Sequence, residues 1–227
     1  MKPSVPMPCL CVVTDRSFFM CDTDRMVRCL SDAVAGGASM VQVRERGMDD
    51  QAILELAREL RRITRGSALL MVNGSPELAA ACDADGVQLP EAGAAVDVAR
   101  GIVGDGKLVG RSVHSVSGAI DAEREGADLL VAGTIYASRS HTGVEPSGPS
   151  LLSNIARQVS LPLLGIGGIG PGNIGTIIDA GAWGAAVISA VLEASDPGEA
   201  CRDMIAQMKQ ASTSTGGDAR NFQGSDA

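Results

Sequence analysis

Aromatic side chains are scarce in this sequence. The 227 residues include one tryptophan, one tyrosine and three phenylalanines. Aromatic rings are the side chains best suited to stacking against another flat ring. With so few of them, a ring-shaped substrate would be held mostly by aliphatic and polar groups.

Positive charge is also in short supply. The formal net charge is −8 at pH 7, and the chain contains no basic run and no zinc-finger spacing. Because nucleic-acid-binding domains carry clustered lysine and arginine, a general nucleic-acid surface is excluded. No segment approaches the ~20 apolar residues of a membrane span, and the N-terminus lacks a charged-then-apolar leader. We therefore expect a cytoplasmic protein that binds neither nucleic acid nor membrane.

No two cysteines have the CxxC spacing that is typical of metal and redox sites. The six cysteines are Cys9, Cys11, Cys21, Cys29, Cys82 and Cys201. Free cysteine is among the most buried residue types, and disulfides are rare in the cytoplasm. We expect buried or incidental thiols rather than metal ligands or disulfides.

Short apolar runs alternate along the chain with stretches of helical periodicity. Continuous apolar runs predict parallel strands at residues 10–14, 40–43, 68–72, 86–89, 108–110 and 129–132, and two more within 161–190. Helical spacing predicts helices at 24–35, 49–63, 76–81, 94–101, 116–125, 151–159 and 197–209. Eight βα units predict an α/β protein, a single (β/α)8 TIM barrel over residues 1–210. The polar segment 211–227 is expected to be a disordered tail.

Residues 161–190 contain a glycine-rich turn between two of the predicted strands. Backbone N–H groups in such a turn can approach an anion, and Pro171 suits the first position of the helix that follows. The consecutive ends of strands seven and eight often bind phosphate in TIM barrels. We predict that phosphate is bound by Gly167, Gly168, Ile188 and Ser189. The alternative is a tight strand–helix turn without a ligand.

Polar residues follow most of the other predicted strands, at the end where barrel active sites lie. Those expected to contact the substrate are Gln42, Arg44, Arg46, Asn73, Gln88, Ser112, Thr134 and His141. Strand alternation places Gln42, Arg44 and Arg46 on one face, which is the interior if the strand stays regular. Inward arginines need an anion. Either the substrate is negative at two places, or the arginines pair with Asp15 or Glu45.

The chain has two histidines, and both fall near strand ends. His114 follows Ser112 by two residues, so the two side chains are expected on the same side. Imidazole suits proton transfer near neutral pH, which makes His114 the candidate catalytic residue. The alternative is a histidine that caps a loop. His141 lies in the polar loop 137–149, where it either contacts the ligand or is solvated.

The sequence contains six motifs at or near strand ends. They are VVTD in the first strand, QVRERG, MVNG, GVQLP and GRSVHS at four later strand ends, and VISAVLEASDP after the eighth strand. In these motifs the chain resembles the thiamine phosphate synthase/TenI superfamily of small barrels, over nearly the whole barrel. Thiamine phosphate synthases join an aminopyrimidine pyrophosphate to a thiazole phosphate. TenI-like proteins are thiazole tautomerases, which aromatise a thiazole carboxylate phosphate.

The resemblance also shows departures from the synthase pattern. Synthases typically hold Mg²⁺ with aspartates of an Asn-Asp pair after strand three and of GVHxGQxD after strand four. Here Gly74 and Gly93 occupy those positions, and Arg46 and His141 stand at or near two positions where lysines are expected. The four motifs are similar to the TenI-like subfamily, although TenI-like proteins often keep a lysine near His141. A histidine at position 114 occurs in both subfamilies and does not separate them.

The resemblance therefore implies a thiazole tautomerase that needs no metal and no other cofactor, and whose partner is a small phosphorylated thiazole. His114 would take the proton from the ring carbon that bears the carboxylate, and the exocyclic carbon would be reprotonated. Three alternatives stay open: a thiamine phosphate synthase with displaced Mg²⁺ ligands, a non-catalytic regulatory protein that binds thiazole phosphate, and a phosphosugar isomerase on the same barrel. Association into a homo-oligomer is also left open.

Overall fold

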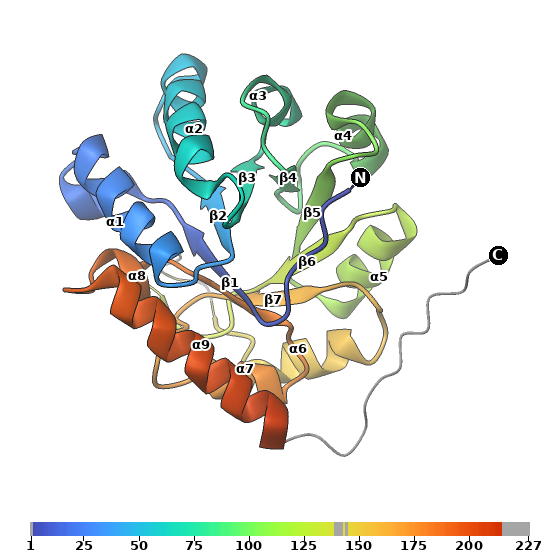
Figure 1. Cartoon of the computed structure of the whole chain (residues 1–227). Helices are drawn as coiled ribbons and strands as arrows, with labels where there is room; N and C mark the ends of the chain where they lie inside the picture. The colour runs from blue at the N-terminus through green and yellow to red at the C-terminus, as the bar shows by residue number, and fades with distance from the viewer. Residues whose placement is uncertain (1, 139–142, 144, 215–227) are drawn as a thin grey trace.

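The computed structural model describes residues 2–138, 143 and 145–214 (Figure 1). Eight parallel strands form a closed barrel in which each strand pairs with its sequence neighbours and β8 pairs with β1. The strands are β1 (Cys9–Val13), β2 (Met40–Val43), β3 (Leu69–Asn73), β4 (Gly86–Leu89), β5 (Leu108–Val113), β6 (Leu129–Ala132), β7 (Leu163–Ile166) and β8 (Gly184–Val187). The predicted (β/α)8 TIM barrel is confirmed.

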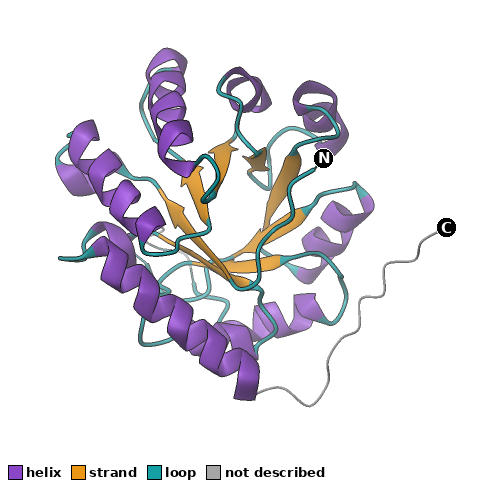
Figure 2. Ribbon diagram, in the orientation of Figure 1, coloured by secondary structure: helices purple, strands orange, loops and turns teal. Residues whose placement is uncertain are grey.

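Helices surround the strands on the outside of the barrel, as Figures 1 and 2 show. They are η1, a 3₁₀ turn (Arg16–Phe19), α1 (Thr23–Ala35), α2 (Asp50–Thr64), α3 (Pro76–Ala81), α4 (Val96–Val103), α5 (Val116–Arg124), α6 (Pro149–Ala156), α7 (Ile174–Asp179), α8 (Ser189–Leu192) and α9 (Pro197–Ser214). The closing helix α9 lies against α1 and α7 and so joins the first and last units of the barrel.

Strand alternation separates two apolar cores. In β1, Leu10 and Val12 face the helices, whereas Cys9, Cys11 and Val13 face the barrel interior. The interior also contains Met40, Met71, Leu108, Leu129, Val131, Leu164 and Ala186. This packed interior closes the barrel below the strand ends, so a ligand at this end stays at the mouth and does not enter the interior.

The cysteines behave as small apolar residues. All six are free, and all but Cys21 are buried. Burial raises the pKa of the Cys9 thiol to about 11, and this effect outweighs the hydrogen bond from Ser39, which lowers the pKa. Such a thiol stays protonated at neutral pH and is a poor nucleophile.

Several boundaries differ from the sequence-based predictions. Strand β5 continues to Val113, three residues past its predicted end, because it pairs with β6 as far as Val113↔Ala132. Helix α9 continues to Ser214, and Ala211 packs against the outer core, so the predicted tail is helical in its first four residues. The rest of the predicted tail, residues 215–227, lies outside the described residues.

Aspartates hold the opposite end of the barrel, where the strands begin. The carboxylate of Asp85 accepts the Leu70 N–H at 2.7 Å and a hydrogen bond from Arg61 at 2.6 Å. Asp128 accepts the Val109 N–H at 2.8 Å and also contacts Arg100 and Lys2. Asp85 immediately precedes β4 and binds β3, and Asp128 immediately precedes β6 and binds β5. Each aspartate therefore links two neighbouring strands.

No helix in the described part of the chain is long and apolar enough to cross a lipid bilayer.

Candidate functional site

A cavity of about 180 Å³ opens where β7 and β8 end. Its lining includes all four residues predicted to bind phosphate, Gly167, Gly168, Ile188 and Ser189. The remaining lining residues are Phe18, Ala137, Ser138, Ile166, Ile169, Ala186 and Val187. The cavity therefore combines a glycine turn with an apolar wall, which suits an anionic group attached to an apolar body.

The glycines are required by close packing as well as by their conformation. Gly167 and Gly168 have φ angles of 103° and 61°, in the region that favours glycine. A Cβ on Gly167 would lie 2.7 Å from Cγ2 of Thr134, and one on Gly168 would lie 2.5 Å from the carbonyl oxygen of Ala137. The loop after β6 thus rests directly on the glycine turn. Thr134, predicted to contact substrate, is buried behind the turn instead of lining the cavity.

Asn173 closes the same turn. Its side chain accepts the Gly170 N–H at 2.9 Å and donates to the carbonyl oxygen of Gly168 at 2.9 Å. Helix α7 begins only at Ile174, so the prediction that Pro171 occupies the first helical position is wrong. The turn residues between Gly170 and Ile174 are held by the Asn173 side chain, and the sequence pattern offered no sign of this role.

Donors in the cavity wall have no partner within the described chain. The N–H groups of Gly168, Ile169 and Ser189 donate no hydrogen bond to any described residue. The buried hydroxyl oxygen of Ser138 is likewise without a partner. Ile169 and the Ser138 hydroxyl are buried, whereas Gly168 is exposed and Ser189 is partly exposed, so water or a ligand with acceptor oxygens can reach these N–H groups.

A row of polar side chains crosses the mouth beside the cavity. Gln42 donates to Asn73 at 3.2 Å, and Gln88 donates to Ser112 at 3.1 Å. The four residues lie on the inward faces of consecutive strands β2 to β5, above the apolar interior. The structure therefore brings these four predicted substrate-binding residues together.

The two arginines after β2 do not continue the strand. The strand ends at Val43, so alternation no longer applies, and Arg46 is exposed rather than inward. Arg44 is half-buried; burial, and then the neighbouring Arg46, lower the pKa of its guanidinium. Neither arginine forms a direct ion pair with another described residue, but the charges of Asp15 and Glu45 raise the pKa of Arg44 against these effects, so the alternative pairing is present only as a longer-range attraction.

The carboxylate of Glu45 accepts a hydrogen bond from the start of η1. Its Oε2 accepts the Arg16 N–H at 3.1 Å, and its Oε1 is buried without a hydrogen bond. Burial raises the pKa of the Glu45 carboxyl above its ordinary value. Arg44 is therefore a half-buried cation that forms no direct ion pair with a described residue, although the charges of Asp15 and Glu45 act on it. An anionic substrate group could bind it directly.

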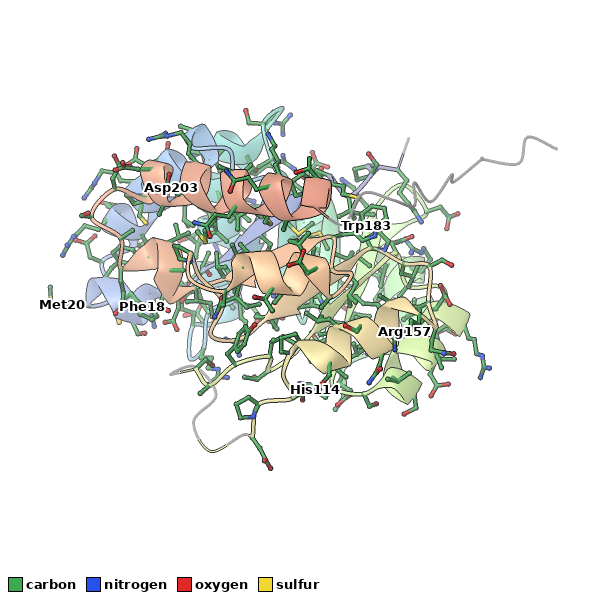
Figure 3. The ribbon with its side chains drawn as sticks, turned by 90° about the horizontal axis from the view of Figure 1, so that it is seen from below. Phe18, Met20, His114, Arg157, Trp183 and Asp203 are labelled. Atoms are coloured by element: carbon green, nitrogen blue, oxygen red, sulfur yellow. The ribbon has the colours of Figure 1, made fainter. Side chains whose placement is uncertain are left out.

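His114 lies at the end of β5 and is paired with Glu91. Nδ1 of His114 is 2.9 Å from Oε2 of Glu91, and the His114 backbone N–H donates to Oε1 at 3.2 Å. Both side chains are about half-exposed, at 55% and 48%. Figure 3 shows His114 and Phe18 toward the lower part of the view and Trp183, which precedes β8, toward the opposite end of the barrel. Sequence reasoning missed Glu91, although the GVQLPEAG motif contains it.

The donor set after β3 and β4 does not fit a magnesium site. Mg²⁺ is usually held by one or two carboxylates together with water and substrate phosphate. The two positions where the resemblance predicts such carboxylates are occupied by Gly74 and Gly93. Gly74 has a φ of 86°, and a Cβ on Gly93 would lie 2.9 Å from Pro90. Aspartates at these positions would require a different backbone. His141, the remaining predicted contact, lies outside the described residues.

The fold and the site together define a (β/α)8 barrel with a glycine-lined cavity at the ends of β7 and β8. The sequence model of the family described as thiamine monophosphate synthase matches residues 10–191. The chain belongs to this family, which confirms its predicted membership of the thiamine phosphate synthase/TenI superfamily.

Individual relatives agree with this assignment. The chain is 39% identical over 203 residues to a thiamine-phosphate synthase of Chlorobium luteolum, covering 88% of this chain and 93% of the relative. It is 40% identical over 176 residues to a putative thiamine-phosphate synthase of Geobacter sulfurreducens, covering 77% and 83%. A solved thiamine phosphate pyrophosphorylase from Pyrococcus furiosus superposes with a TM-score of 0.81 at 33% identity, covering 89% and 96%.

These names support an enzyme of thiamine biosynthesis. Between the two reactions predicted from the sequence, they favour the synthase, which was the alternative, over the tautomerase.

Proposed function

We propose that this protein is a thiazole tautomerase that aromatises a thiazole carboxylate phosphate. The observation that carries the proposal is the chemistry of the barrel mouth. Glycines stand where a synthase has its metal carboxylates, and their backbone disfavours aspartate. An imidazole able to move a proton stands at the end of β5.

The substrate follows from the separate parts of the site. The phosphate would bind the free N–H groups of the cavity near Gly168, Ile169 and Ser189. The ring carboxylate would face the polar row, with Arg44, Asn73 and Gln88 as donors. Phe18 and the aliphatic residues of the cavity wall would contact the carbon skeleton.

The reaction is a proton shift that balances without another reactant. His114 takes the proton from the ring carbon between the imine nitrogen and the carboxylate. The electron pair of that C–H bond moves through the ring to the exocyclic double bond, whose outer carbon accepts a proton. Aromatisation favours the product, so a single positioned acid–base group, worth about 10²–10⁴-fold in rate, suffices.

A thiamine phosphate synthase is the second candidate, and the names of the relatives favour it. It would require Mg²⁺ ligands other than residues 74 and 93. A non-catalytic regulatory protein that binds thiazole phosphate would use the same cavity without turnover.

The test is a pair of assays on one preparation. Aromatisation of the thiazole carboxylate phosphate is followed by absorbance with a chelator present. Formation of thiamine phosphate from the two phosphorylated precursors is followed with and without Mg²⁺. We expect chelator-resistant tautomerisation and no coupling. Coupling that depends on Mg²⁺, without tautomerisation, would establish the synthase, and binding without either reaction would establish a regulatory role.

A further inference from the structure

We propose that Glu91 is a positioning residue that holds His114 in the tautomer needed for proton abstraction. The interaction itself is inferred from the geometry of the two loops that carry Glu91 and His114. Its effect on catalysis rests on the proposed function.

The carboxylate of Glu91 contacts His114 at two atoms. One oxygen is 2.9 Å from Nδ1, and the other accepts the His114 backbone N–H at 3.2 Å. Because a carboxylate only accepts hydrogen bonds, the short contact to Nδ1 requires a proton on that nitrogen. In the neutral ring, Nε2 is then the unprotonated nitrogen that can act as a base. Nε2 forms no hydrogen bond with the residues that the structure describes.

The loop that carries Glu91 is held from below by Arg111. This arginine is 7% exposed and donates to the carbonyl oxygens of Pro90 at 2.9 Å and of Ala94 at 2.8 Å. The Gly93 N–H also donates to the Pro90 carbonyl at 2.8 Å. The backbone on both sides of Glu91 is therefore fixed to β5, the strand that ends at His114.

The first turn of α5 fixes the other side of the pair. Ser115 caps this helix by accepting the Gly118 N–H at 3.1 Å, and a Cβ on Gly118 would lie 3.4 Å from Oε1 of Glu91. The carboxylate thus lies over the start of the nine-residue helix α5, where a negative charge is favoured. Arg111, the nearest basic residue on β5, is occupied by the loop carbonyls and contacts Glu125 at 3.5 Å.

The direct test measures the tautomer and needs no substrate. Nitrogen-15 NMR of labelled protein reports which ring nitrogen of His114 carries the proton in the neutral form. We expect the Nδ1–H form to dominate in the parent and to lose its dominance in Glu91→Gln and Glu91→Ala. The control is Glu77→Gln, which removes an exposed carboxylate at the start of α3 that contacts Ser75. An unchanged tautomer in both Glu91 variants would overturn the proposal.

Kinetics separate the positioning role from a structural one. In Glu91→Gln we expect kcat for tautomerisation to fall with KM little changed, by no more than the ~10²–10⁴-fold that the general base His114 itself contributes. A rise in KM with unchanged kcat would overturn the catalytic consequence. If the parent protein shows no tautomerisation, the proposed function fails, while the NMR result still decides whether Glu91 sets the tautomer.

Discussion

At the scale of single residues, glycines shape the barrel mouth in two different ways. Gly167 and Gly168 create the cavity by leaving backbone N–H groups uncovered against the loop after β6. Gly74 and Gly93 provide no carboxylate at the two positions where the resemblance to synthases predicts metal ligands. The same residue type therefore both lines the cavity at the ends of β7 and β8 and leaves positions 74 and 93 without a carboxylate.

His114→Ala is expected to lower tautomerisation by about 10²–10⁴-fold, because the general base is removed. Binding of thiazole phosphate should persist, since the cavity is formed by β7 and β8 and by residues Phe18, Ala137 and Ser138 rather than by His114. Activity is measured by absorbance and binding by calorimetry. Full activity in this variant would remove His114 from the mechanism.

Gly168→Ala is expected to destabilise the protein by about 1–3 kcal/mol, because its φ of 61° and the carbonyl oxygen of Ala137 leave no room for a Cβ. Affinity for thiazole phosphate should fall as well. Gly172→Ala is the matched control in the same turn, since a Cβ there meets nothing within 4 Å. Urea unfolding of both variants measures the difference, and equal stabilities would contradict the steric explanation.

At the scale of elements, aspartate side chains link neighbouring strands at the end of the barrel opposite the site. Each of these aspartates comes just before a strand. Asp85 and Asp128 each bind a backbone N–H of the preceding strand and an arginine, which is Arg61 for Asp85 and Arg100 for Asp128. Burial acts to raise the pKa of Asp128, but the hydrogen bonds from Lys2, Arg100 and Val109 outweigh it and lower the pKa below its ordinary value. The ionised form of Asp128 is thus favoured by folding.

Asp128→Asn is expected to lower the free energy of unfolding at pH 7 by about 1.5–3 kcal/mol, the usual contribution of hydrogen bonds to a charged group. Because the folded pKa is lowered, this contribution is present above the unfolded pKa and is lost as pH falls below about 5 toward the folded pKa. The difference between parent and variant should therefore shrink on acidification. Chemical denaturation at pH 7 and pH 3.5 tests this, and a constant difference would contradict the linkage.

At the scale of the whole molecule, the barrel separates stability from function. The interior is filled by apolar side chains, and the site occupies only the mouth, where β-strand ends meet the loops after them. The cavity between β7 and β8 and the pair of Glu91 with His114 lie in different βα units. A ligand that joins them would connect the last and the middle units of the barrel.

Thiazole phosphate is expected to stabilise the folded protein, because a ligand that binds only the folded state at about 100 times its Kd contributes about 2.7 kcal/mol. The unphosphorylated thiazole alcohol should give a much smaller rise in Tm, since it cannot satisfy the free N–H groups of the cavity. Differential scanning fluorimetry compares the two ligands. Equal shifts would show that the cavity does not recognise the phosphate.

Much of the architecture could be predicted from local sequence. Apolar runs and helical spacing are short-range patterns, so the order of strands and helices and the closed barrel followed from them. The glycine turn and the polar residues after strands β2 to β5 could be placed at the mouth because a parallel barrel brings all strand ends to one face. The hypothesis of a tautomerase also came from the sequence alone, through Gly74 and Gly93, and the names of the relatives favour the synthase instead.

Tertiary structure decided which of these residues interact. Glu91 and His114 are 23 positions apart. Their contact depends on the register of β4 with β5 and on the hydrogen bond from Arg111 to the loop that contains Glu91. The start of α7 and the closure of the turn by Asn173 depend on side-chain contacts that periodicity does not encode. The exposure of Arg46 followed from the end of β2 at Val43. The sequence by itself thus determined the fold and the composition of the mouth, whereas pairing across loops required the closed barrel, because such contacts form only between segments that folding brings together.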